Sequence, residues 1–395
     1  MPIEVGVRAQ ARRAIDVDDM RRLARRRLPP MVFDAFDGGA EDEVTLRANR
    51  EAYAQLRLRP RSLVDVSTRD AAVELFGDRL TMPVVLAPTG SARLADSRAE
   101  LVIARAARAA GTIYVHSAVA SYSLEDVAQS GPLWFQMYLP SDRGRARTLI
   151  DRVAAAGYRA LVLTIDTSVR GNRVRDERNR FSLPYRVTPH LIMQGLSRPA
   201  WSAEFVAGNL RPEARQAAQR KARDGRASLR QVEQAIIGAR WPATWEDLDW
   251  VRSVWTGPLL IKGLPRAEEC EEMIARGVDG FIVSNHGGRQ LDGAPPTIEV
   301  LPEIVEAVSG RAVVLVDGGI RRGSDVLKAV ALGATACLVG RPYLYGLAAG
   351  GEPGLTRVMD IFRTEIDRTM ALLGVTSLEE LDGSFVMRSA DLTVA

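Results

Sequence analysis

The chain has 395 residues, 46% of them hydrophobic, so it is long enough to bury a large core. Its 53 basic and 49 acidic residues leave a net charge of only +4, which argues against a nucleic-acid-binding protein. The two cysteines, Cys270 and Cys337, have no metal-ligand spacing, so we expect free core thiols in a reducing compartment and no metal site. We also expect a cytoplasmic protein, because the sequence has no apolar signal core and no run near the roughly 20 apolar residues that span a bilayer.

The N-terminal part of the chain, residues 1–80, is expected to form a helical cap over a larger fold. Residues 17–28 alternate acids and arginines with Leu or Met at helical spacing and end at Leu28-Pro29-Pro30. This pattern is typical of a short amphipathic helix. We expect a second helix to follow it.

Eight short apolar runs come next, each bounded by turn or helix signals. They are residues 83–87, 113–116, 133–137, 161–165, 258–261, 280–283, 312–316 and 336–339. Most precede a helical pattern, such as residues 99–110 or residues 324–332, where Ser324 is the expected N-terminal cap. Eight alternating units predict an α/β fold, a (β/α)8 TIM barrel, within a single domain of residues 1–395. The runs lack polar alternation because strands of a parallel barrel are covered on both faces.

Polar groups and glycines follow each run, at the end of the barrel where such folds carry their active sites. They are Pro88-Thr89-Gly90, Ser117, Gln136 with Tyr138, Thr164 with Asp166, Lys262, residues 284–289, Asp317-Gly318-Gly319 with Arg321, and Gly340-Arg341. Each alone has a structural explanation in turns or backbone hydrogen bonds, but the whole set predicts a functional rim. Lys262 stands out because only three of the 53 basic residues are lysines, which indicates a role that arginine cannot fill.

The loop after residues 280–283 brings together a candidate base and a candidate anion clamp. His286 can take a proton near neutral pH, and Arg289 can bind a carboxylate through two parallel hydrogen bonds. The paired glycines Gly287 and Gly288 let the backbone approach a flat ligand closely.

The two glycine-arginine loops, at residues 317–321 and 340–341, follow consecutive strands. Barrels bind phosphate at this place through backbone N–H groups and helix dipoles. Flavin mononucleotide (FMN), with one phosphate and a flat ring, fits this arrangement, and no dinucleotide fingerprint competes with it.

Residues 284–292, Ser-Asn-His-Gly-Gly-Arg-Gln-Leu-Asp, closely resemble the active-site loop of the FMN-dependent 2-hydroxy-acid oxidase and dehydrogenase family. The resemblance covers about residues 15–388 and is greatest to the mandelate dehydrogenase pattern, including Trp134-Phe135-Gln136. It implies oxidation of an (S)-2-hydroxy acid to the 2-oxo acid through FMN, with oxygen or a quinone-type molecule as electron acceptor. It also implies a homo-oligomer, commonly a tetramer.

The resemblance assigns roles position by position. The residues that it implies in cofactor binding are Ala87, Pro88, Thr89, Gly90, Ser117, Gln136, Thr164, Lys262, Ser284, Asp317, Gly318, Gly319, Arg321, Gly340 and Arg341. For the substrate it implies His286 as the catalytic base, Asp166 as the carboxylate that stabilises its imidazolium, Arg289 and Arg173 as carboxylate clamps, and Tyr138 as a catalytic hydrogen-bond partner. This division agrees with the chemistry, because the oxidation removes a proton while two electrons pass to the flavin, and an adjacent Asp favours a charged His. An ammonium group, at Lys262, would stabilise a reduced, anionic flavin.

Residues 31–42, Met-Val-Phe-Asp-Ala-Phe-Asp-Gly-Gly-Ala-Glu-Asp, match the N-terminal segment of the family with one departure. The family ordinarily has a substrate-contacting Tyr two residues after the aromatic that Phe33 represents, and this chain has Ala35 there. Ala35 removes one charge-assisted hydrogen bond to the substrate carboxylate and opens a ring-sized space. We therefore expect an aryl or long-chain substrate, mandelate-like or lactate-like in its reacting part.

Residues 181–243 separate the fourth and fifth runs by more chain than a barrel needs, so we expect an inserted loop. Apolar residues gather in its first half, at 190–193, Trp201 and Phe205-Val206, and residues 211–230 carry seven bases against two acids. A lid or subunit contact and a segment that docks on the inner face of an anionic membrane are both open interpretations. The resemblance adds that the corresponding insertion attaches mandelate dehydrogenase to membrane.

Two other functions stay open at this point. One is FMN-dependent oxidation of an amine or modified peptide in cofactor biosynthesis, as in the mycofactocin-pathway member of the family, where the N-terminal Tyr is also absent. The other is a non-catalytic scaffold that binds membrane or protein. The retained Arg289 argues against the first, and the intact His286, Asp166 and Lys262 argue against the second.

Overall fold

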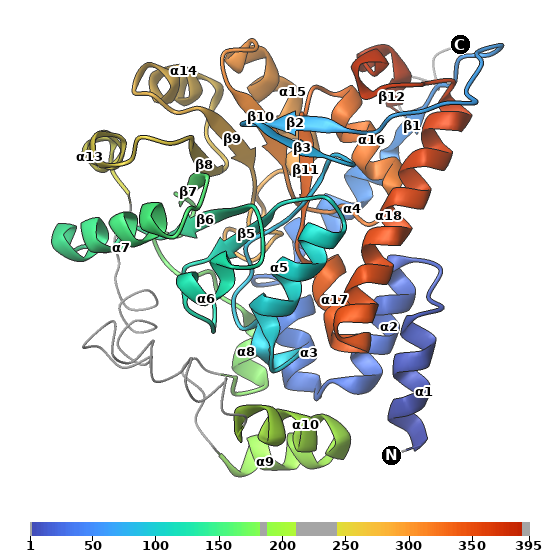
Figure 1. The fold of residues 1–395 in the computed structure, drawn as a ribbon, viewed down its shortest axis with the longest axis vertical. Helices are drawn as coiled ribbons and strands as arrows, with labels where there is room; N and C mark the ends of the chain where they lie inside the picture. Colours follow the sequence, from blue (N-terminus) through green and yellow to red (C-terminus); the bar gives the residue numbers. More distant parts are fainter. Residues whose placement is uncertain (1, 182–187, 211–242, 389–395) are drawn as a thin grey trace.

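A closed barrel of eight parallel strands forms the centre of the molecule (Figure 1). The computed structural model describes residues 2–181, 188–210 and 243–388. The barrel strands are β4 (Val84–Leu86), β5 (Tyr114–Ser117), β6 (Leu133–Met137), β7 (Ala160–Thr164), β8 (Leu259–Gly263), β9 (Gly280–Val283), β10 (Val313–Val316) and β11 (Ala336–Val339), and they pair in the order β10-β11-β4-β5-β6-β7-β8-β9. Each predicted apolar run overlaps one strand, so the predicted fold class is confirmed.

Burial on both faces of the strands explains why the predicted runs lack polar alternation. Alternate side chains form two clusters: Trp134 and Val162 pack together inside the barrel, whereas Phe135 and Leu161 pack with the surrounding helices. The register is continuous across neighbours, since Val162 pairs with Gln136 on one side and Leu260 on the other. Burial of each such apolar side chain contributes about 1.5–3 kcal/mol.

A short hairpin closes the N-terminal end of the barrel. Its strands β2 (Val73–Leu75) and β3 (Asp78–Leu80) are antiparallel, and Leu75 and Leu80 belong to the cluster inside the barrel. Phe76, in the turn, meets Trp134 edge-on with ring centroids 5.7 Å apart. The hairpin leaves only the opposite, carboxyl end of the barrel for a site.

The N-terminal cap contains four helices: α1 (Pro2–Ala11), α2 (Val17–Arg27), α3 (Pro30–Asp37) and α4 (Val44–Gln55). Helix α2 confirms the predicted amphipathic helix, and the Asp16 side chain caps it by accepting the Asp19 N–H. Helix α3 is the expected second helix, and it begins at Pro30, where a missing N–H is harmless. Its direction carries residues 31–37 toward the rim of the barrel.

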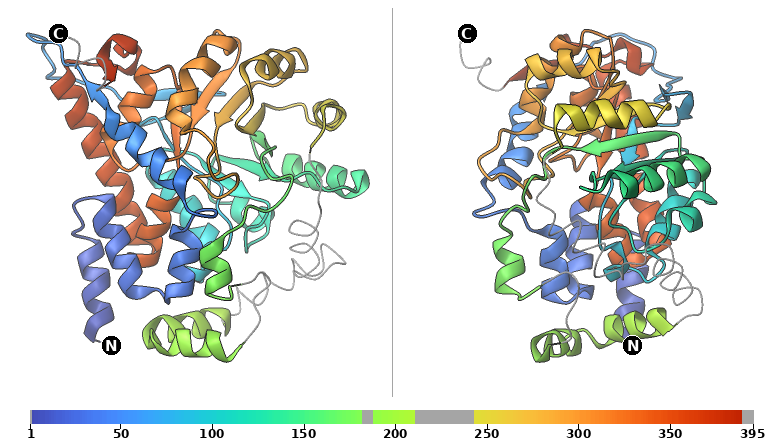
Figure 2. Two further views of the ribbon diagram at one scale, coloured as in Figure 1. Left: turned by 180° about the vertical axis from the view of Figure 1, so that it is seen from behind. Right: turned by 90° about the vertical axis from the view of Figure 1, so that its left-hand side faces the viewer.

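Helices and short segments surround the barrel (Figure 2). They are α5 (Ala99–Ala109), α6 (Leu124–Ala128), α7 (Arg143–Ala155), α8 (Val174–Arg178), α13 (Trp245–Val254), α14 (Ala267–Ala275), α15 (Thr297–Val308), α16 (Gly323–Ala331), α17 (Arg341–Gly350), α18 (Glu352–Leu373), the 3-10 turns Ala92–Leu94, Leu378–Glu380 and Gly383–Phe385, and the strand pair β1 (Leu56–Leu58) and β12 (Val386–Arg388). Cys270 on α14 and Cys337 on β11 are buried free thiols, as expected.

The predicted cap of helix α16 was wrong. The helix begins at Gly323, so Ser324 lies within its first turn. Arg322 is the N-cap residue, and Asp325 in the first turn reaches back to it, because its Oδ2 accepts the backbone N–H groups of Arg321 at 2.9 Å and Arg322 at 3.0 Å. A carboxylate at this position also interacts favourably with the helix dipole.

The inserted segment is partly helical, so the expectation of a loop was wrong for residues 189–210. Helices α9 (Pro189–Leu196) and α10 (Pro199–Leu210) lie at the same end of the molecule as the start of α1 (Figures 1 and 2). Trp201 is buried, its Nε1 donates to Leu94 O at 2.8 Å, and its ring stacks on Phe205. Residues 182–187 and 211–242, including the basic stretch 211–230, lie outside the described residues. Within the described parts, no helix has the length and apolarity needed to cross a membrane.

Candidate active site

A cavity of about 1500 Å³ opens at the carboxyl ends of the barrel strands. Nearly all predicted site residues line it; Asp166 and Ser284 do not. These two contact residues that do, because Asp166 lies against His286 and Ser284 Oγ accepts from Lys262 Nζ at 2.6 Å. The structure therefore brings the whole predicted set to one place.

His286 and Asp166 form a pair across the cavity wall. His286 Nδ1 lies 3.1 Å from Asp166 Oδ1 and 3.2 Å from Oδ2, so the Nδ1 proton faces the carboxylate and Nε2 is left as the basic atom. Burial lowers the pKa of His286, against the opposing pull of Asp166. Burial pushes the pKa of Asp166 upward, but the attraction and hydrogen bond of His286, together with the charge of Lys262, outweigh it and the pKa is lowered. The result is a neutral imidazole beside an ionised carboxylate.

The backbone around His286 is strained. His286 has φ +57° and is followed by Gly287 at φ +64° and Gly288 at φ +71°, three successive left-handed residues of which one is not glycine. Gly288 has no room for a side chain, since a Cβ there would lie 2.6 Å from the Leu46 N on helix α4. This conformation turns the imidazole toward Asp166 and the backbone of the loop toward α4.

A buried pair of amides holds the same loop to the N-terminal cap. Asn49 on α4 and Asn285 exchange two hydrogen bonds, of 2.9 and 2.8 Å. Asn285 Oδ1 also accepts the Gly288 N–H at 3.1 Å. On the far side of Asn49, its carbonyl would lie 2.1 Å from a Cβ on Gly319, so α4 packs directly on the predicted phosphate loop as well.

Arg289 and Arg173 line the cavity together with Tyr138. Burial, with repulsion from Arg173 and Arg341, lowers the pKa of Arg289 well below its ordinary value. Burial and the charge of Arg170 likewise lower the pKa of Arg173, and its Nε has no hydrogen-bond partner among the described residues. Clustered cations with spare donors favour an anion between them, and a carboxylate matches the guanidinium fork. Burial raises the pKa of Tyr138 to about 12, so its hydroxyl stays protonated and can donate.

The end of helix α3 orients two of these arginines. The carbonyl of Gly38 accepts from Arg289 Nη1 at 2.7 Å and from Arg341 Nη2 at 2.8 Å. Arg341 also donates to Phe36 O and Gly287 O, so its side chain, predicted to bind phosphate, links α3 to the His286 loop. Nothing in the sequence near Gly38 marks this role, because its partners are more than 250 residues away.

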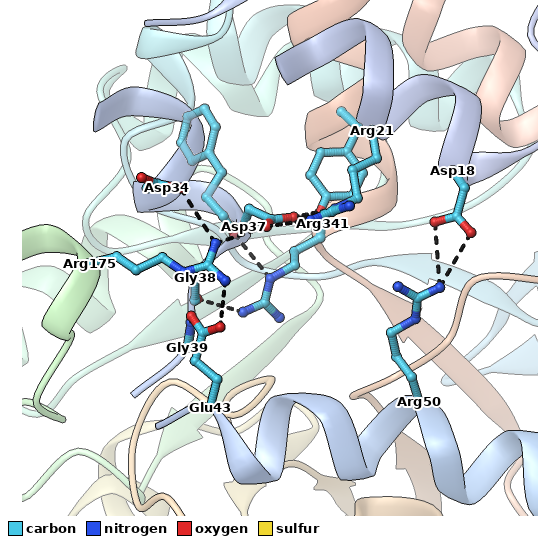
Figure 3. A network of polar contacts seen from close by, with 12 residues as sticks. Asp18, Arg21, Asp34, Asp37, Gly38, Gly39, Glu43, Arg50, Arg175 and Arg341 are labelled. Carbon is cyan, nitrogen blue, oxygen red and sulfur yellow. Dashed lines mark hydrogen bonds and ion pairs between the residues drawn. The ribbon is translucent and has the colours of Figure 1, made fainter. Parts of the chain in front are cut away.

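The neighbouring Asp37 is the centre of an ion network, shown in Figure 3. Arg21 on α2 binds it with two hydrogen bonds, of 2.6 and 2.8 Å, and the Tyr345 hydroxyl donates to it at 2.7 Å. Arg175 on α8 reaches it at 3.2 Å and also pairs with Glu43. Arg175 is two residues from Arg173 in sequence, so this Asp37 network fixes the cap against the segment that carries a clamp.

The rest of the cavity fits a flavin. A chain of buried side chains crosses three strand ends, with Ser117 Oγ donating to Gln136 Oε1 at 3.1 Å and Gln136 Nε2 to Thr164 Oγ1 at 2.9 Å. Lys262 Nζ lies 3.0 Å from Asp317 Oδ2, and Asp317 Oδ1 is buried without a hydrogen-bond partner in the described chain. Arg321 Nε, also buried, is equally without a partner there. An acceptor and a donor left over beside the Gly318-Gly319 turn are suited to the hydroxyl and phosphate groups of FMN.

Comparison with known proteins decides the family. Residues 24–388 match the family of FMN-dependent dehydrogenases. The chain belongs to this family. It is 41% identical over 383 residues to an L-lactate oxidase of Nostoc sp., covering 94% of this chain and 98% of the relative. It is also 41% identical over 375 residues to an (S)-mandelate dehydrogenase of Pseudomonas putida, covering 94% and 93% of the two chains, and 40% identical over 388 residues to glycolate oxidase 1 of Zea mays, covering 95% and 96%.

Solved structures agree with this assignment. A monotopic membrane protein, (S)-mandelate dehydrogenase, superimposes with a TM-score of 0.84 at 39% identity, over 95% of this chain and 99% of that one. Mandelate oxidase with benzoyl-formic acid gives a TM-score of 0.78 at 38% identity, over 93% and 96%. The enzyme is therefore an FMN-dependent 2-hydroxy-acid oxidase or dehydrogenase with FMN as its cofactor, which confirms the predicted family, enzyme class and cofactor.

Proposed function

We propose that this enzyme oxidises an (S)-2-hydroxy acid with an aryl or long-chain substituent to the 2-oxo acid. The observation that supports this substrate class is the place of Ala35. It lies on α3, buried, and lines the cavity that Arg173, Arg289 and Tyr138 also line. A methyl group at this position leaves space beside the clamp that a larger substrate can fill with apolar contacts, each Å² contributing about 25 cal/mol.

The residues divide the work as follows. Arg289 and Arg173 bind the substrate carboxylate, and the hydroxyl of Tyr138 donates a hydrogen bond to the substrate. His286 takes a proton from the substrate at Nε2, and Asp166 stabilises the imidazolium that results. FMN, when bound, supplies the acceptor for two electrons, and Lys262 places a positive charge among the residues that would hold it.

The test is anaerobic mixing of the FMN-loaded enzyme with glycolate, lactate, mandelate and a long-chain 2-hydroxy acid. Bleaching of the flavin absorbance by the larger acids is the expected result, with little change for glycolate. Admission of air or of a quinone then identifies the electron acceptor. If amines or peptides bleach the flavin and no hydroxy acid does, the enzyme oxidises an amine or modified peptide instead. The paired arginines Arg289 and Arg173 argue against this alternative.

For the acceptor we propose oxygen or a quinone-type molecule, with a preference for the dehydrogenase type. Gly90 lines the cavity. A Cβ at this position would lie only 2.8 Å from Val119 Cγ2, so an alanine would require the Val119 side chain to shift. The family resemblance supports this preference, because it implies Ala at this position in the oxidases and Gly, as at Gly90, in mandelate dehydrogenase. Reoxidation rates with air and with a quinone measure the preference directly.

We also propose a homotetramer and peripheral contact with membrane. Helices α9 and α10 expose large apolar side chains, namely Ile192, Met193, Leu196, Val206 and Leu210. Apolar side chains on short surface helices are typical of interfacial segments, and a related solved structure is described as a monotopic membrane protein. The basic residues 211–230 are the expected electrostatic partner of an anionic surface, so vesicle binding should weaken with salt.

A further inference from the structure

A second cavity, of about 280 Å³, lies between helix α10 and the connection from β4 to α5, apart from the active-site cavity. Four arginines from four segments line it: Arg8 on α1, Arg27 on α2, Arg93 in the 3-10 turn Ala92–Leu94, and Arg98 just before α5. Two carboxylates, Asp96 and Glu204, also line it. The described lining therefore has two more positive than negative charges.

Three of the four arginines have carboxylate partners. Glu204 on α10 pairs with Arg8 through one oxygen and with Arg27 through the other. Asp96 pairs with Arg98 at 3.3 Å. Arg93 has no carboxylate partner among the residues that the structure describes, and its Nε is buried there without a hydrogen-bond partner. A buried donor without an acceptor is unfavourable, and an anion in the cavity would satisfy it.

Folded elements hold the cavity in shape. The Arg27 side chain is only 4% exposed, and its Nη1 donates to the carbonyls of Ala95 at 3.3 Å and Ala348 at 2.5 Å. Helix α10 sits directly on the β4–α5 connection, since a Cβ on Gly208 would lie 2.2 Å from Ser97 Cβ. Arg27 is thus held in place by a formed site, whereas the side chains of Arg8 and Arg98 are 47% and 42% exposed at the mouth of the cavity.

We propose that this cavity binds a phosphate group, as a phosphate monoester or diester. A tetrahedral phosphate offers acceptor oxygens in several directions, which suits guanidinium groups that arrive from separate elements. A soluble phosphate ester and an anionic lipid headgroup share this chemistry. Among the described residues, none that lines this cavity also lines the active-site cavity, so we expect substrate oxidation to proceed without its ligand.

The test uses the FMN-loaded full chain in two arms. Calorimetry measures binding of glycerol phosphate, and co-sedimentation measures binding to phosphatidylcholine vesicles with and without phosphatidylglycerol. Arg93→Gln should weaken phosphate binding about tenfold or more, because it removes charge-assisted hydrogen bonds. Arg79→Gln is the matched control, since it removes an equal charge from an exposed arginine on β3, a strand that Figure 1 shows far from α10.

Each outcome decides the proposal. Weakening in the soluble arm supports a phosphate ester as ligand, and weakening confined to phosphatidylglycerol vesicles supports a lipid headgroup. The proposal is overturned if native protein binds in neither arm, if Arg93→Gln binds like native protein, or if Arg79→Gln weakens binding equally. Glu204→Gln provides a second variant, expected to tighten binding because it removes a competing carboxylate. Flavin reduction by substrate should stay unchanged in all three variants, which shows that each is folded.

Discussion

The Nδ1 atom of His286 lies 3.1 Å from Asp166 Oδ1, and both residues are placed by barrel strands that are not adjacent. Strand β7 ends two residues before Asp166, and β9 ends three residues before His286. The pairing fixes the tautomer of the imidazole and leaves Nε2 to face the cavity.

Replacement of the base, His286→Ala, should leave FMN bound and abolish reduction by substrate. General-base catalysis contributes about 10²–10⁴-fold, so the rate of flavin bleaching should fall by at least that range. Stopped-flow absorbance under anaerobic conditions measures it, and the flavin spectrum checks the fold. Near-native bleaching by the variant would place the base elsewhere.

Replacement of the carboxylate, Asp166→Asn, should lower the maximum value of kcat/KM and also shift the pH at which kcat/KM declines in acid. The base works only when neutral, so kcat/KM falls as the pH drops through the pKa of His286, which burial lowers below its ordinary value of 6.5. Asp166 opposes that lowering, so its loss should move the acid limb to still lower pH. The plateau should fall about 10- to 150-fold, as expected for one charge-assisted hydrogen bond of about 1.5–3 kcal/mol. An acid limb that moves to higher pH would contradict this account of the pair.

The Asp37 network predicts a large difference in stability between Asp-to-Asn replacements at two residues that Figure 3 labels, Asp37 and Asp18. Asp37 is buried and bound by Arg21 and Arg175, so Asp37→Asn should lower the free energy of unfolding by about 3–5 kcal/mol. Asp18 forms one exposed pair with Arg50 at 3.3 Å, so Asp18→Asn should cost about 1 kcal/mol or less. Urea unfolding at neutral pH compares them.

The same network has a pH signature. Burial opposes ionisation of Asp37, but the hydrogen bonds from Arg21 and Tyr345 outweigh it, and the pKa is lowered. Its contribution to stability is therefore complete above the unfolded-state pKa, about 3.9, and is lost as the pH falls below that value toward the folded-state pKa. Native protein should lose this contribution only in acid, and Asp37→Asn should lack that part of the acid dependence.

The exposed apolar side chains of α9 and α10 predict membrane binding that does not depend on catalysis. Ile192→Ser, Met193→Ser and Leu196→Ser together remove three exposed apolar side chains, each worth about 1.5–3 kcal/mol if buried in lipid, so vesicle binding should fall about 100-fold or more. Ile15→Ser with Leu372→Ser is the control, because both side chains are equally exposed but lie elsewhere. Equal vesicle binding by the two sets of variants would reject the membrane contact.

The strands and the reacting residues were predictable because their signals are local. An apolar run followed by Ser-Asn-His-Gly-Gly-Arg needs no distant partner to be recognised, and each run did contain barrel strand. The positioning contacts were not predictable, since Gly38 O meets Arg289 across 251 residues and Asn49 meets Asn285 across 236. Neither asparagine has a periodic or spacing signal that separates it from a surface amide.

Two local features were also missed, for different reasons. The β2–β3 hairpin has strands of three residues, too short for alternation to be decisive, although Phe76-Gly77 is a plausible turn signal. Residue type alone favours Ser324 as a cap, whereas Asp325 satisfies two backbone N–H groups and so sets an earlier start for α16. In both cases tertiary packing and hydrogen-bond geometry overrode a weak local preference.

The substrate prediction depends on Ala35, and two variants separate its two physical effects. Ala35→Tyr would restore a ring and a hydroxyl beside the clamp, whereas Ala35→Phe would restore only the ring. If the missing hydroxyl limits small acids, Ala35→Tyr should raise kcat/KM for glycolate and lactate about 10- to 150-fold, the equivalent of one charge-assisted hydrogen bond, and Ala35→Phe should not. Both variants should lower kcat/KM for mandelate and a long-chain acid, because both fill the space that these substrates would occupy. If glycolate is already the best substrate of the native enzyme, or if Ala35→Tyr gains nothing on small acids, another side chain fills the space and the assignment to aryl or long-chain acids is wrong.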